Sequence, residues 1–389
     1  MVSEKFDLTF VLPGFPLHKS GGHTIIFELA RMSKLDGFNV RLVFVKDVYK
    51  EIAHLISDEK IVNYIKQRSF LHLIYNKVIN TQIGIKFLIK ILRHIMRIKY
   101  SEDIDGLNVE FVRNFGKFEI NSKILISASY LTSVILGSVS IPKETSLYNF
   151  IQNQEDNPDM TGDLWSLARK SYEYPMKLIV INKREYERFV LNHPIFLPIG
   201  INSKFALKKR PEDRNPRTVL FFLSKSNYKG AKYAIEAINL LHEVDKSIEV
   251  YSFGNYSGID IPKNLKHLGM ISDSDLVDLY NACSVFVLPS LVEGVPAPGL
   301  EAMACGCALI STLNGGVDEY VIDGVNGILV PIKDSNSIVH AVIELVKNDE
   351  RRVSIAHNGT ETAKNYDYKH MYSAFKREVL NANLSQFKN

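Results

Sequence analysis

Cysteine is scarce in this 389-residue chain, which contains three cysteines and a single tryptophan. Cys283, Cys305 and Cys307 cannot build a disulfide framework, so they indicate a reducing compartment. Cys305 and Cys307 lack the second cysteine pair of a zinc site, and we expect them to be small structural residues. No apolar run reaches the ~18 uncharged residues that a membrane-spanning helix needs.

The chain also lacks a strong excess of charge of either sign. Its 47 Lys and Arg and 43 Asp and Glu give a net charge of +4. This balance does not by itself indicate a nucleic-acid partner. The N-terminal MVSEKFDLTFVLP has two early acids and leads directly into an apolar run, so we expect no signal peptide and a cytoplasmic protein. The length favours two domains over one.

Apolar runs of strand length alternate with segments of helical spacing. DLTFVLP, a glycine-rich loop GFPLHKSGGH, a helix TIIFELARMSKLDG and a strand NVRLVFV predict a βαβ unit. A second series, with strands TVLFFL, IEVYSF, SVFVLP and ALIS, follows the polar stretch 207–217. The pattern predicts an α/β fold with two Rossmann-like doubly wound parallel-sheet domains facing a cleft, at residues 1–200 and 201–366. We expect a C-terminal helix in 367–389 to cross back to the N-terminal domain.

Residues 61–100 contain no acid. Within them Lys86, Lys90, Arg93 and Arg97 are spaced by four, three and four positions, which places them on one face of a helix. A basic amphipathic helix of this kind favours a peripheral position on an anionic membrane surface, here the inner face of the plasma membrane. A core-packed helix with a solvated cationic edge is the alternative.

The stretch PSLVEGVPAPGLEAMACGCALIS, residues 289–311, contains two glutamates among prolines and glycines. Pro296 and Pro298 disfavour a helix before them, so Glu293 is predicted on a loop. Pro298 suits the first turn of a helix, and LEAMAC continues it, which predicts Glu301 in that first turn. A loop carboxylate beside the amides of a helix start is suited to a phosphate-bearing ligand.

This stretch resembles the signature of retaining glycosyltransferase family 4, which has the GT-B fold. The matching residues are Pro289-Ser290, Glu293-Gly294, Pro298 and Glu301-Ala302, with seven residues between the two glutamates. The resemblance continues through STLNGGVDEYVIDGVNGILV, which contains the family's GG-x-x-E and DG-x-x-G-x-L-V patterns. Pro296 departs from the family, which usually has glycine there, and removes one backbone donor.

By this resemblance, Glu293 bonds hydroxyls of the donor sugar and Glu301 bonds the ribose of a nucleoside-diphosphate-sugar. The family's basic pair after the first strand of this domain corresponds to Lys225 and Lys229, although the usual arginine is absent near Ser224. Glu293, Lys229 and Lys225 are therefore the expected catalytic residues. The expected donor-binding residues are Gly21, Gly22, Ser224, Gly254, Met270, Ala297, Gly299, Leu300 and Glu301.

The N-terminal domain is expected to supply the acceptor side. Ser20-Gly21-Gly22 matches the family's glycine loop, and NFIQNQED (149–156) resembles the FVQDYE-type segment of rhamnosyltransferase-like members. The candidates for acceptor or donor-sugar contact are His18, His23, Gln152, Asn153 and Glu155. Loop histidines that are merely solvated, and ordinary turn polarity in 149–156, are the alternatives.

The resemblance implies a retaining hexosyltransferase that acts on a glycan or lipid-linked acceptor in cell-surface polysaccharide synthesis, without a cofactor, metal or nucleic acid. Asp273-Ser274-Asp275 is expected to start a helix rather than to bind a metal. A sugar-nucleotide epimerase of the same fold and a non-catalytic nucleotide-sugar-binding protein remain alternatives. A Rossmann dehydrogenase is disfavoured because GFPLHKSGGH lacks G-x-G-x-x-G. The base, the sugar and the acceptor stay open, with UDP, dTDP-rhamnose and GDP-mannose as options.

Overall fold

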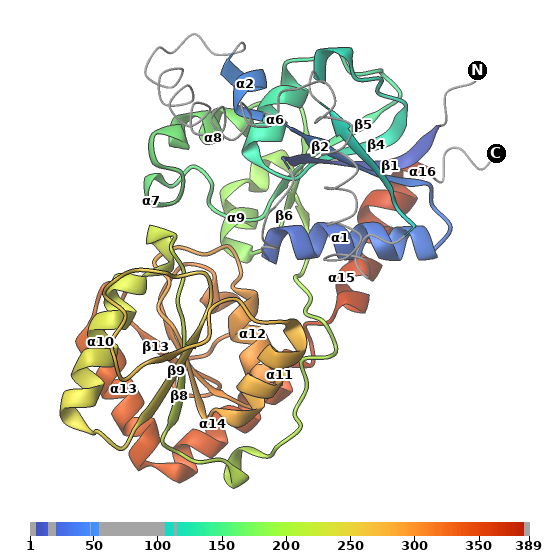
Figure 1. Cartoon of the computed structure of the whole chain (residues 1–389). Helices are drawn as coiled ribbons and strands as arrows, with labels where there is room; N and C mark the ends of the chain where they lie inside the picture. The colour runs from blue at the N-terminus through green and yellow to red at the C-terminus, as the bar shows by residue number, and fades with distance from the viewer. Residues whose placement is uncertain (1–4, 15–20, 47, 54–105, 113–114, 385–389) are drawn as a thin grey trace, which may run out of the picture. The chain divides into compact units, whose positions relative to one another are not determined.

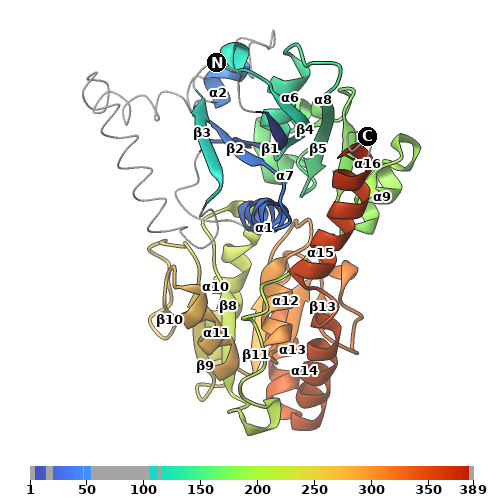
Figure 2. The same ribbon diagram turned by 90° about the vertical axis from the view of Figure 1, so that its right-hand side faces the viewer.

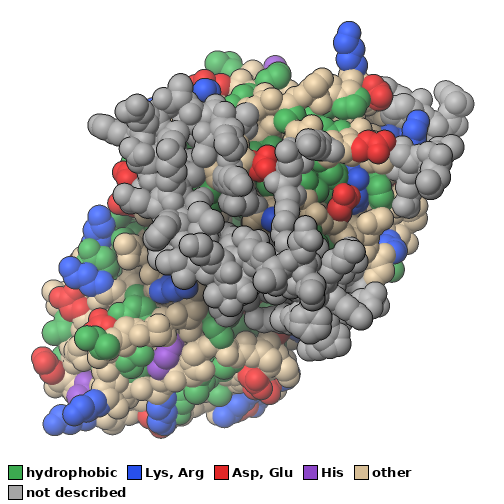
Figure 3. Space-filling view, turned by 45° about the horizontal axis from the view of Figure 1, so that its top comes forward, with side chains coloured by type: hydrophobic (Ala, Val, Ile, Leu, Met, Phe, Trp, Pro, Cys, Tyr) green, Lys and Arg blue, Asp and Glu red, His purple; other side chains and the backbone are tan. Residues whose placement is uncertain are grey.

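The computed structural model describes residues 5–14, 21–46, 48–53, 106–112 and 115–384. The basic segment predicted at 61–100 and the candidate His18 lie outside these residues. No helix in the described ranges is both long and apolar enough to cross a membrane. Among the described residues visible in Figure 3, Lys and Arg side chains are interspersed with Asp and Glu.

The chain folds into two compact units, whose boundaries are not simple cuts in the sequence. The last helical segment belongs to the first unit, where the Phe375 ring stacks on Phe10 at 6.1 Å and the Tyr372 hydroxyl donates to Asp36 at 2.8 Å. Figure 2 shows this segment beside the first unit's strands. The first unit comprises Met1–Val180, Tyr186–Leu197 and Tyr372–Asn389, and the second comprises Ile181–Glu185 and Pro198–Met371.

The first unit is built on a seven-stranded parallel sheet in the order β3-β2-β1-β4-β5-β6-β7. Its interior strand β1 is almost wholly buried, as expected for a parallel strand with both faces covered. Phe10 of β1 lies opposite Leu42 of β2 and Ile126 of β4. The strands are β1 Phe6–Pro13, β2 Val40–Val45, β3 Asn108–Val112, β4 Ser122–Ser127, β5 Ser146–Ile151, β6 Lys177–Val180 and β7 Ile195–Phe196.

The second unit contains a six-stranded parallel sheet in the order β10-β9-β8-β11-β12-β13. The predicted fold class of two doubly wound parallel sheets is therefore confirmed. The sequence patterns missed the short strands β3, β7 and β13, whose few residues give little periodicity. The strands are β8 Thr218–Phe222, β9 Glu249–Phe253, β10 Lys266–His267, β11 Val285–Leu288, β12 Ala308–Thr312 and β13 Ile328–Val330.

Helices cover both faces of the second sheet, as Figure 1 shows for α10 and α13 on one side and α11 and α12 on the other. The first unit contains α1 Gly21–Leu35, α2 Val48–Ala53, α6 Tyr130–Gly137, α7 Pro158–Thr161, α8 Trp165–Ser171 and α16 Ala382–Leu384, and the second contains α10 Ala231–Val244, α11 Asp273–Ala282, α12 Ala297–Ala304, α13 Ser335–Lys347 and α14 Asp349–Ala363. Helices α9 Lys183–Arg188 and α15 Tyr368–Phe375 cross the boundary between units.

The start of α1 corrects the predicted glycine-rich loop. Gly21, Gly22 and His23 form the first turn of α1 instead of the end of the loop. The buried face of this helix begins with Ile25 and Ile26, and the turn before them continues the helix in spite of its two glycines. The backbone amides of this first turn lie at the N-terminus of the helix, whose partial positive charge favours anions.

The strand order in each unit changes direction at one point, between β1 and β4 in the first unit and between β8 and β11 in the second. In open parallel sheets of this kind, ligands bind outside the carboxyl ends of the strands at this switch point. In the second unit the chain leaving β8 carries Ser224, Lys225 and Lys229, and the chain leaving β11 carries Glu293. The predicted site residues of this unit therefore flank its switch point.

Arg214 anchors the opposite end of the second unit. Its guanidinium is 3% exposed and donates to the Tyr280 carbonyl at 3.0 Å, to the Cys283 carbonyl at 2.9 Å and to the Cys305 carbonyl. These carbonyls end α11 and α12, where the helix dipoles place partial negative charge. Burial raises the pKa of the nearby Cys307 thiol to about 12. Cys305 and Cys307 are buried and free, as structural residues would be.

Replacing Arg214 should destabilise the second unit. Because Arg214→Lys leaves buried carbonyls without donors at a cost of about 2–3 kcal/mol, we expect the apparent melting temperature to fall by roughly 5–10 °C. Arg210→Lys is the control, since this exposed side chain pairs with Asp213 at the surface and its replacement should shift melting by about 1 °C or less. Equal melting curves for the two variants would contradict the anchoring role.

Candidate functional site

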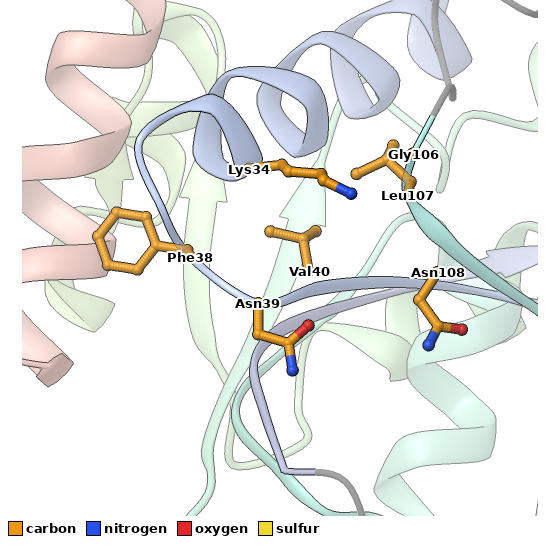
Figure 4. A pocket seen from close by; sticks show the side chains of 7 residues that line it. All are labelled: Lys34, Phe38, Asn39, Val40, Gly106, Leu107 and Asn108. Atoms are coloured by element: carbon orange, nitrogen blue, oxygen red, sulfur yellow. The ribbon is translucent and has the colours of Figure 1, made fainter.

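The carboxyl edge of each sheet gathers the predicted residues, whereas the pocket drawn in Figure 4 lies elsewhere. This cavity of about 280 Å³ is lined by Lys34, by Phe38–Val40 and by Gly106–Asn108. It lies where β2 and β3 begin, at the amino edge of the first sheet, and contains none of the predicted site residues. Since ligands of parallel sheets bind at the carboxyl edge, the candidate site lies there.

Lys229 and Glu293 form an ion pair in the second unit. The Lys229 ammonium bonds both carboxylate oxygens of Glu293, at 2.6 and 2.8 Å. The Glu293 side chain is 6% exposed and that of Lys229 is 20% exposed. The ammonium also lies over the Phe222 and Tyr228 rings, at 5.9 and 5.4 Å from their centroids. Two residues predicted to bind different parts of the donor are thus directly joined.

A glycine fixes the position of Lys229 against the loop that carries Glu293. Gly230 has φ of +69°, and a Cβ on it would lie 1.9 Å from the Pro289 carbonyl oxygen. Only glycine tolerates both this backbone conformation and this close approach. The Leu291 amide completes the contact by donating to the Tyr228 carbonyl at 2.7 Å. The segments that follow β8 and β11 are therefore held close together.

The helix after Glu293 begins earlier than the sequence predicts. Helix α12 starts at Ala297, with Pro298 in its first turn as expected. Glu301 is consequently its fifth residue and lies at the start of the second turn, so its predicted place in the first turn is wrong by one residue. Pro296 has extended geometry and ends the loop, which lets Ala297 open the helix.

The first turn of α12 offers fewer free amides than the sequence suggests. The Gly299 amide donates to the Pro296 carbonyl at 3.1 Å. The Tyr320 hydroxyl donates to the same carbonyl at 3.0 Å, and a Cβ on Gly299 would lie 2.1 Å from that hydroxyl oxygen. Leu300 is buried in the core, while Ala297 is half-buried. Ala297 is thus better placed than Gly299 to offer an amide to a ligand.

The turn after β8 is organised by Asn255. Its side-chain oxygen accepts from the Ser224 hydroxyl at 2.9 Å and from the Lys225 amide at 3.1 Å. The Lys225 side chain is exposed, in contrast to the paired Lys229. The structure thus separates the two predicted cations into one that is held and one that is solvated.

The predicted donor-binding residues Gly254 and Met270 follow the neighbouring strands β9 and β10. A Cβ on Gly254 would lie 2.0 Å from the Leu223 carbonyl oxygen, and the Gly254 amide donates to the Gly269 carbonyl at 2.9 Å. His267 is fixed between the Ser252 hydroxyl at 2.8 Å and the Tyr256 carbonyl at 3.0 Å. The loops after β8, β9 and β10 are therefore adjoining.

Met270 is 55% exposed at the end of this group. A large exposed apolar side chain beside bonded strand ends is suited to contact a planar ring.

In the first unit, Gly22 and Gln152 come together after β1 and β5. A Cβ on Gly22 would lie 2.9 Å from the Gln152 side-chain oxygen, so glycine permits the contact. Gln152 is 8% exposed and donates to the Ala128 carbonyl at 3.4 Å. Burial lowers the pKa of His23 to about 4, so this side chain is neutral at pH 7. His23 lies next to Phe27, with ring centroids 6.1 Å apart.

Glu155 and Asn153 follow in the same turn. The Asn153 carbonyl accepts from the Glu155 amide at 2.8 Å, and the Glu155 carboxyl accepts from the Tyr130 amide at 3.0 Å. Burial raises the pKa of Glu155 to about 8, an effect that the Tyr130 bond opposes and the adjacent Asp156 charge reinforces. Glu155 is therefore mostly protonated at pH 7.

Asp273 and Asp275 start α11, as predicted, but the cap residue is the preceding Ser272. The Ser272 hydroxyl oxygen accepts from the Asp275 amide at 3.2 Å, and Asp273 pairs with Lys204. Across the described ranges, no three His, Cys, Asp or Glu side chains gather in a way that could hold a metal ion.

Sequence reasoning missed Asn182, Asn255, Asn314 and Tyr320. Asn182 donates to the Gly294 carbonyl at 3.0 Å, and the Asn314 carbonyl accepts from the Glu293 amide at 2.9 Å. Asn314 directly precedes the glycines of the GG-x-x-E pattern, which was the one available signal. The others contact the site from distant positions that no local pattern marks.

The titration of Glu155 predicts a pH-dependent stability. The folded pKa of about 8 exceeds the ordinary glutamate value of 4.5, so the fold retains a proton that the unfolded chain releases. Stability from this group is complete below pH 4.5 and is lost as pH rises towards 8, by up to about 1.4 kcal/mol per pH unit. Glu155→Gln should remove this slope in melting temperature, whereas the exposed Glu144→Gln should keep it. A wild-type slope in the Glu155 variant would refute the assignment.

A double-mutant cycle on Lys229→Met and Glu293→Gln should reveal coupling in thermal or denaturant unfolding. Because both groups are largely buried, we expect a coupling energy of about 1–3 kcal/mol. The exposed pair Lys208 and Asp278, 2.8 Å apart, is the control, and its coupling should be close to zero. Additive effects at Lys229 and Glu293 would mean that the pair does not form in solution.

A family model matches most of the second unit. Residues 202–362 match the family model described as Glycosyl transferases group 1. An uncharacterized glycosyltransferase from Methanocaldococcus jannaschii is 32% identical over 202 residues, which cover 49% of this chain and 56% of that protein. The N,N'-diacetylbacillosaminyl-diphospho-undecaprenol alpha-1,3-N-acetylgalactosaminyltransferase of Campylobacter jejuni is 33% identical over 94 residues, or 24% of this chain and 25% of that protein. The chain thus spans only part of the curated relatives that it matches.

The fold of both units is shared with solved structures. The Anabaena protein HepE, solved in complex with UDP and glucose, has a TM-score of 0.68 and 13% identity, and the match covers 96% of this chain and 99% of that chain. At this identity the likeness shows the GT-B fold and nothing finer. The chain therefore has the GT-B fold, and its residues 202–362 are similar to the glycosyl transferases of group 1.

Proposed function

We propose that the chain is a retaining hexosyltransferase, which moves a sugar from a nucleoside-diphosphate-sugar to a glycan or lipid-linked acceptor in cell-surface polysaccharide synthesis. The observation that carries the proposal is the Lys229–Glu293 pair at the switch point of the second unit. The pair and α12 both lie within the residues that match the family model.

The ion pair leaves capacity for a ligand. A lysine ammonium has three N–H donors, of which Glu293 takes two, so the third can bond a phosphate oxygen. A carboxylate accepts about four hydrogen bonds, so Glu293 can also accept from sugar hydroxyls. Glu301 would accept from the ribose hydroxyls in the same way. Lys225 and the start of α12 would add positive potential at the diphosphate.

The positive groups of the proposed site are lysine side chains and the partial charge of a helix N-terminus. We infer that the donor binds there without a metal or another cofactor. As the sugar leaves, negative charge develops on the diphosphate, and Lys229 is held where it would stabilise that charge. In the resembling family, a leaving phosphate oxygen helps to deprotonate the acceptor on the same face. Such a path retains the anomeric configuration and needs no separate protein base.

The first unit would contact the acceptor or the donor sugar. A protonated Glu155 donates a hydrogen bond rather than removing a proton, and a neutral His23 can accept one. These states suit the binding of hydroxyl groups. Gly22 keeps the start of α1 close to Gln152, so both elements would bind one sugar.

The donor is proposed to carry UDP, which is bound by HepE in its solved complex. The rhamnosyltransferase-like segment NFIQNQED keeps dTDP-rhamnose as an option, and a mannosyltransferase from Corynebacterium glutamicum that is named as GDP-mannose-dependent keeps GDP-mannose. The Campylobacter jejuni relative is named for a diphospho-undecaprenol acceptor, which supports a lipid-linked acceptor here. A cytoplasmic enzyme that contacts an anionic membrane through residues 61–100 would meet such an acceptor.

Incubation of the full chain with labelled sugar nucleotides tests the activity. Melting shifts with UDP, dTDP and GDP would first select the base, because a ligand that binds only the folded state raises the melting temperature. We expect transfer of label to an acceptor with retained anomeric configuration. An epimerised donor would identify an epimerase instead, and binding without either reaction would identify a sensor.

Glu301→Gln tests the donor site directly. Loss of charged hydrogen bonds to ribose should raise the Kd of the selected nucleoside diphosphate about 10- to 100-fold in calorimetry. Glu361→Gln is the matched control on the exposed surface of α14, where Glu361 pairs with Lys364. Unchanged affinity of the Glu301 variant would place the ribose elsewhere.

A further inference from the structure

The backbone on both sides of Glu293 is held by buried asparagines. The Glu293 amide donates to the Asn314 carbonyl at 2.9 Å, and the Gly294 carbonyl accepts from the Asn182 side-chain nitrogen at 3.0 Å. Asn182 and Asn314 are 4% and 3% exposed. The peptide group before Glu293 and the one after Gly294 therefore cannot rotate without breaking a buried hydrogen bond.

Asn182 uses both ends of its side chain. Its oxygen accepts from the Glu185 amide at 2.8 Å and so holds the start of α9, while its nitrogen donates to Gly294. Asn182 belongs to Ile181–Glu185, the short segment that contacts place in the second unit. Aspartate could serve α9 but has no hydrogen to donate to Gly294, so the two roles require an amide.

The second glycine of the GG-x-x-E pattern closes the other side of this loop. A Cβ on Gly316 would lie 2.0 Å from the Gly294 oxygen and 2.9 Å from the Glu293 oxygen. The Asn314 side-chain oxygen fixes this turn by accepting from the Gly316 and Val317 amides at 3.2 and 3.0 Å. The Gly294 carbonyl thus lies between a close-packed glycine and the Asn182 amide.

Glu319, the glutamate of the GG-x-x-E pattern, also holds the segment Ile181–Glu185. Its carboxylate accepts from the Lys183 amide at 2.9 Å. Asn182 is therefore attached to the second unit by a further bond, independent of its own side chain. Losing the Asn182 nitrogen as a donor should leave the segment in place while removing the Asn182 bond to the Gly294 carbonyl.

We propose that Asn182 is a positioning residue for Glu293: by holding the Gly294 carbonyl, it sets the carboxylate where it both orients Lys229 and meets the donor sugar. The inference rests on the proposed function for its sugar ligand. Its effect on Lys229 is independent of any activity. Asn182 acts through the backbone and touches neither donor nor acceptor.

Asn182→Asp is the discriminating variant, because it keeps an acceptor for the Glu185 amide and removes the donor to Gly294. Since a shift of the reacting groups by about 1 Å can cost about 100-fold, we expect kcat/KM for the sugar nucleotide to fall about 10- to 100-fold. The Kd of the nucleoside monophosphate, which lacks both the sugar and the β-phosphate that Lys229 would bond, should stay within about twofold. An equal loss of kcat/KM and of affinity for the nucleoside monophosphate, or a parallel fall in melting temperature, would indicate a merely structural role and overturn the proposal.

Asn348→Asp is the matched control. The exposed Asn348 side chain caps α14 by accepting from the Arg351 amide at 3.0 Å. Its substitution by aspartate makes the same chemical change away from the site. This variant should match the wild type in binding and in turnover. A loss of activity there equal to that of the Asn182 variant would mean that added negative charge, not the lost donor, is responsible.

A second readout does not depend on enzymatic activity. Labelling of lysines with an amine-reactive ester, followed by mass spectrometry, compares Lys229 with the exposed Lys225 in the full chain. We expect the ion pair to protect Lys229 in the wild type and Asn182→Asp to raise its labelling several-fold relative to Lys225. Unchanged labelling would overturn the positioning role even if no transfer is found, whereas absence of nucleotide binding and transfer in the wild type would overturn the proposed function alone.

Discussion

The bond between the Lys229 ammonium and the Glu293 carboxylate is the interaction on which the candidate site depends. It joins the chain leaving β8 to the chain leaving β11, at the point where the strand order of the second sheet changes direction. Gly230, pressed against the Pro289 carbonyl, fixes the lysine side of the bond. The held peptides around Glu293 fix the other side. Because both charges are largely buried, their geometry is set before any ligand arrives, and a ligand meets preorganised groups instead of ordering them.

The opposite end of α12 shows how the rest of this unit maintains that geometry. The buried guanidinium of Arg214 has carbonyl oxygens as its partners, and the partial charges of two helix ends offset its own charge. Tyr320, closing over Gly299 and the Pro296 carbonyl, fixes the other end of the helix. α12 is therefore held at both ends, and its start cannot shift relative to Glu293 without breaking buried bonds.

Much of the second unit could be predicted from the sequence, because its chemistry follows local patterns. The strands before Lys229 and Glu293 are apolar runs, and Pro296 and Pro298 mark the start of α12. The position of Glu301 was wrong by one residue because an N-terminal boundary depends on which residue leaves extended geometry first, and no single pattern fixes it. Asn182 could not be found, because its partner Gly294 is 112 positions away along the chain. In the first unit, the raised pKa of Glu155 depends on burial, which only the fold determines.

A crystal structure of the full chain with a bound nucleoside diphosphate tests the central claim most directly. The account predicts the β-phosphate within hydrogen-bond distance of the Lys229 ammonium, the ribose hydroxyls on Glu301, and a Glu293 carboxylate that still contacts Lys229. A nucleotide bound at the amino edge of the first sheet, or one in the second unit that leaves Lys229 and Glu301 untouched, would contradict it.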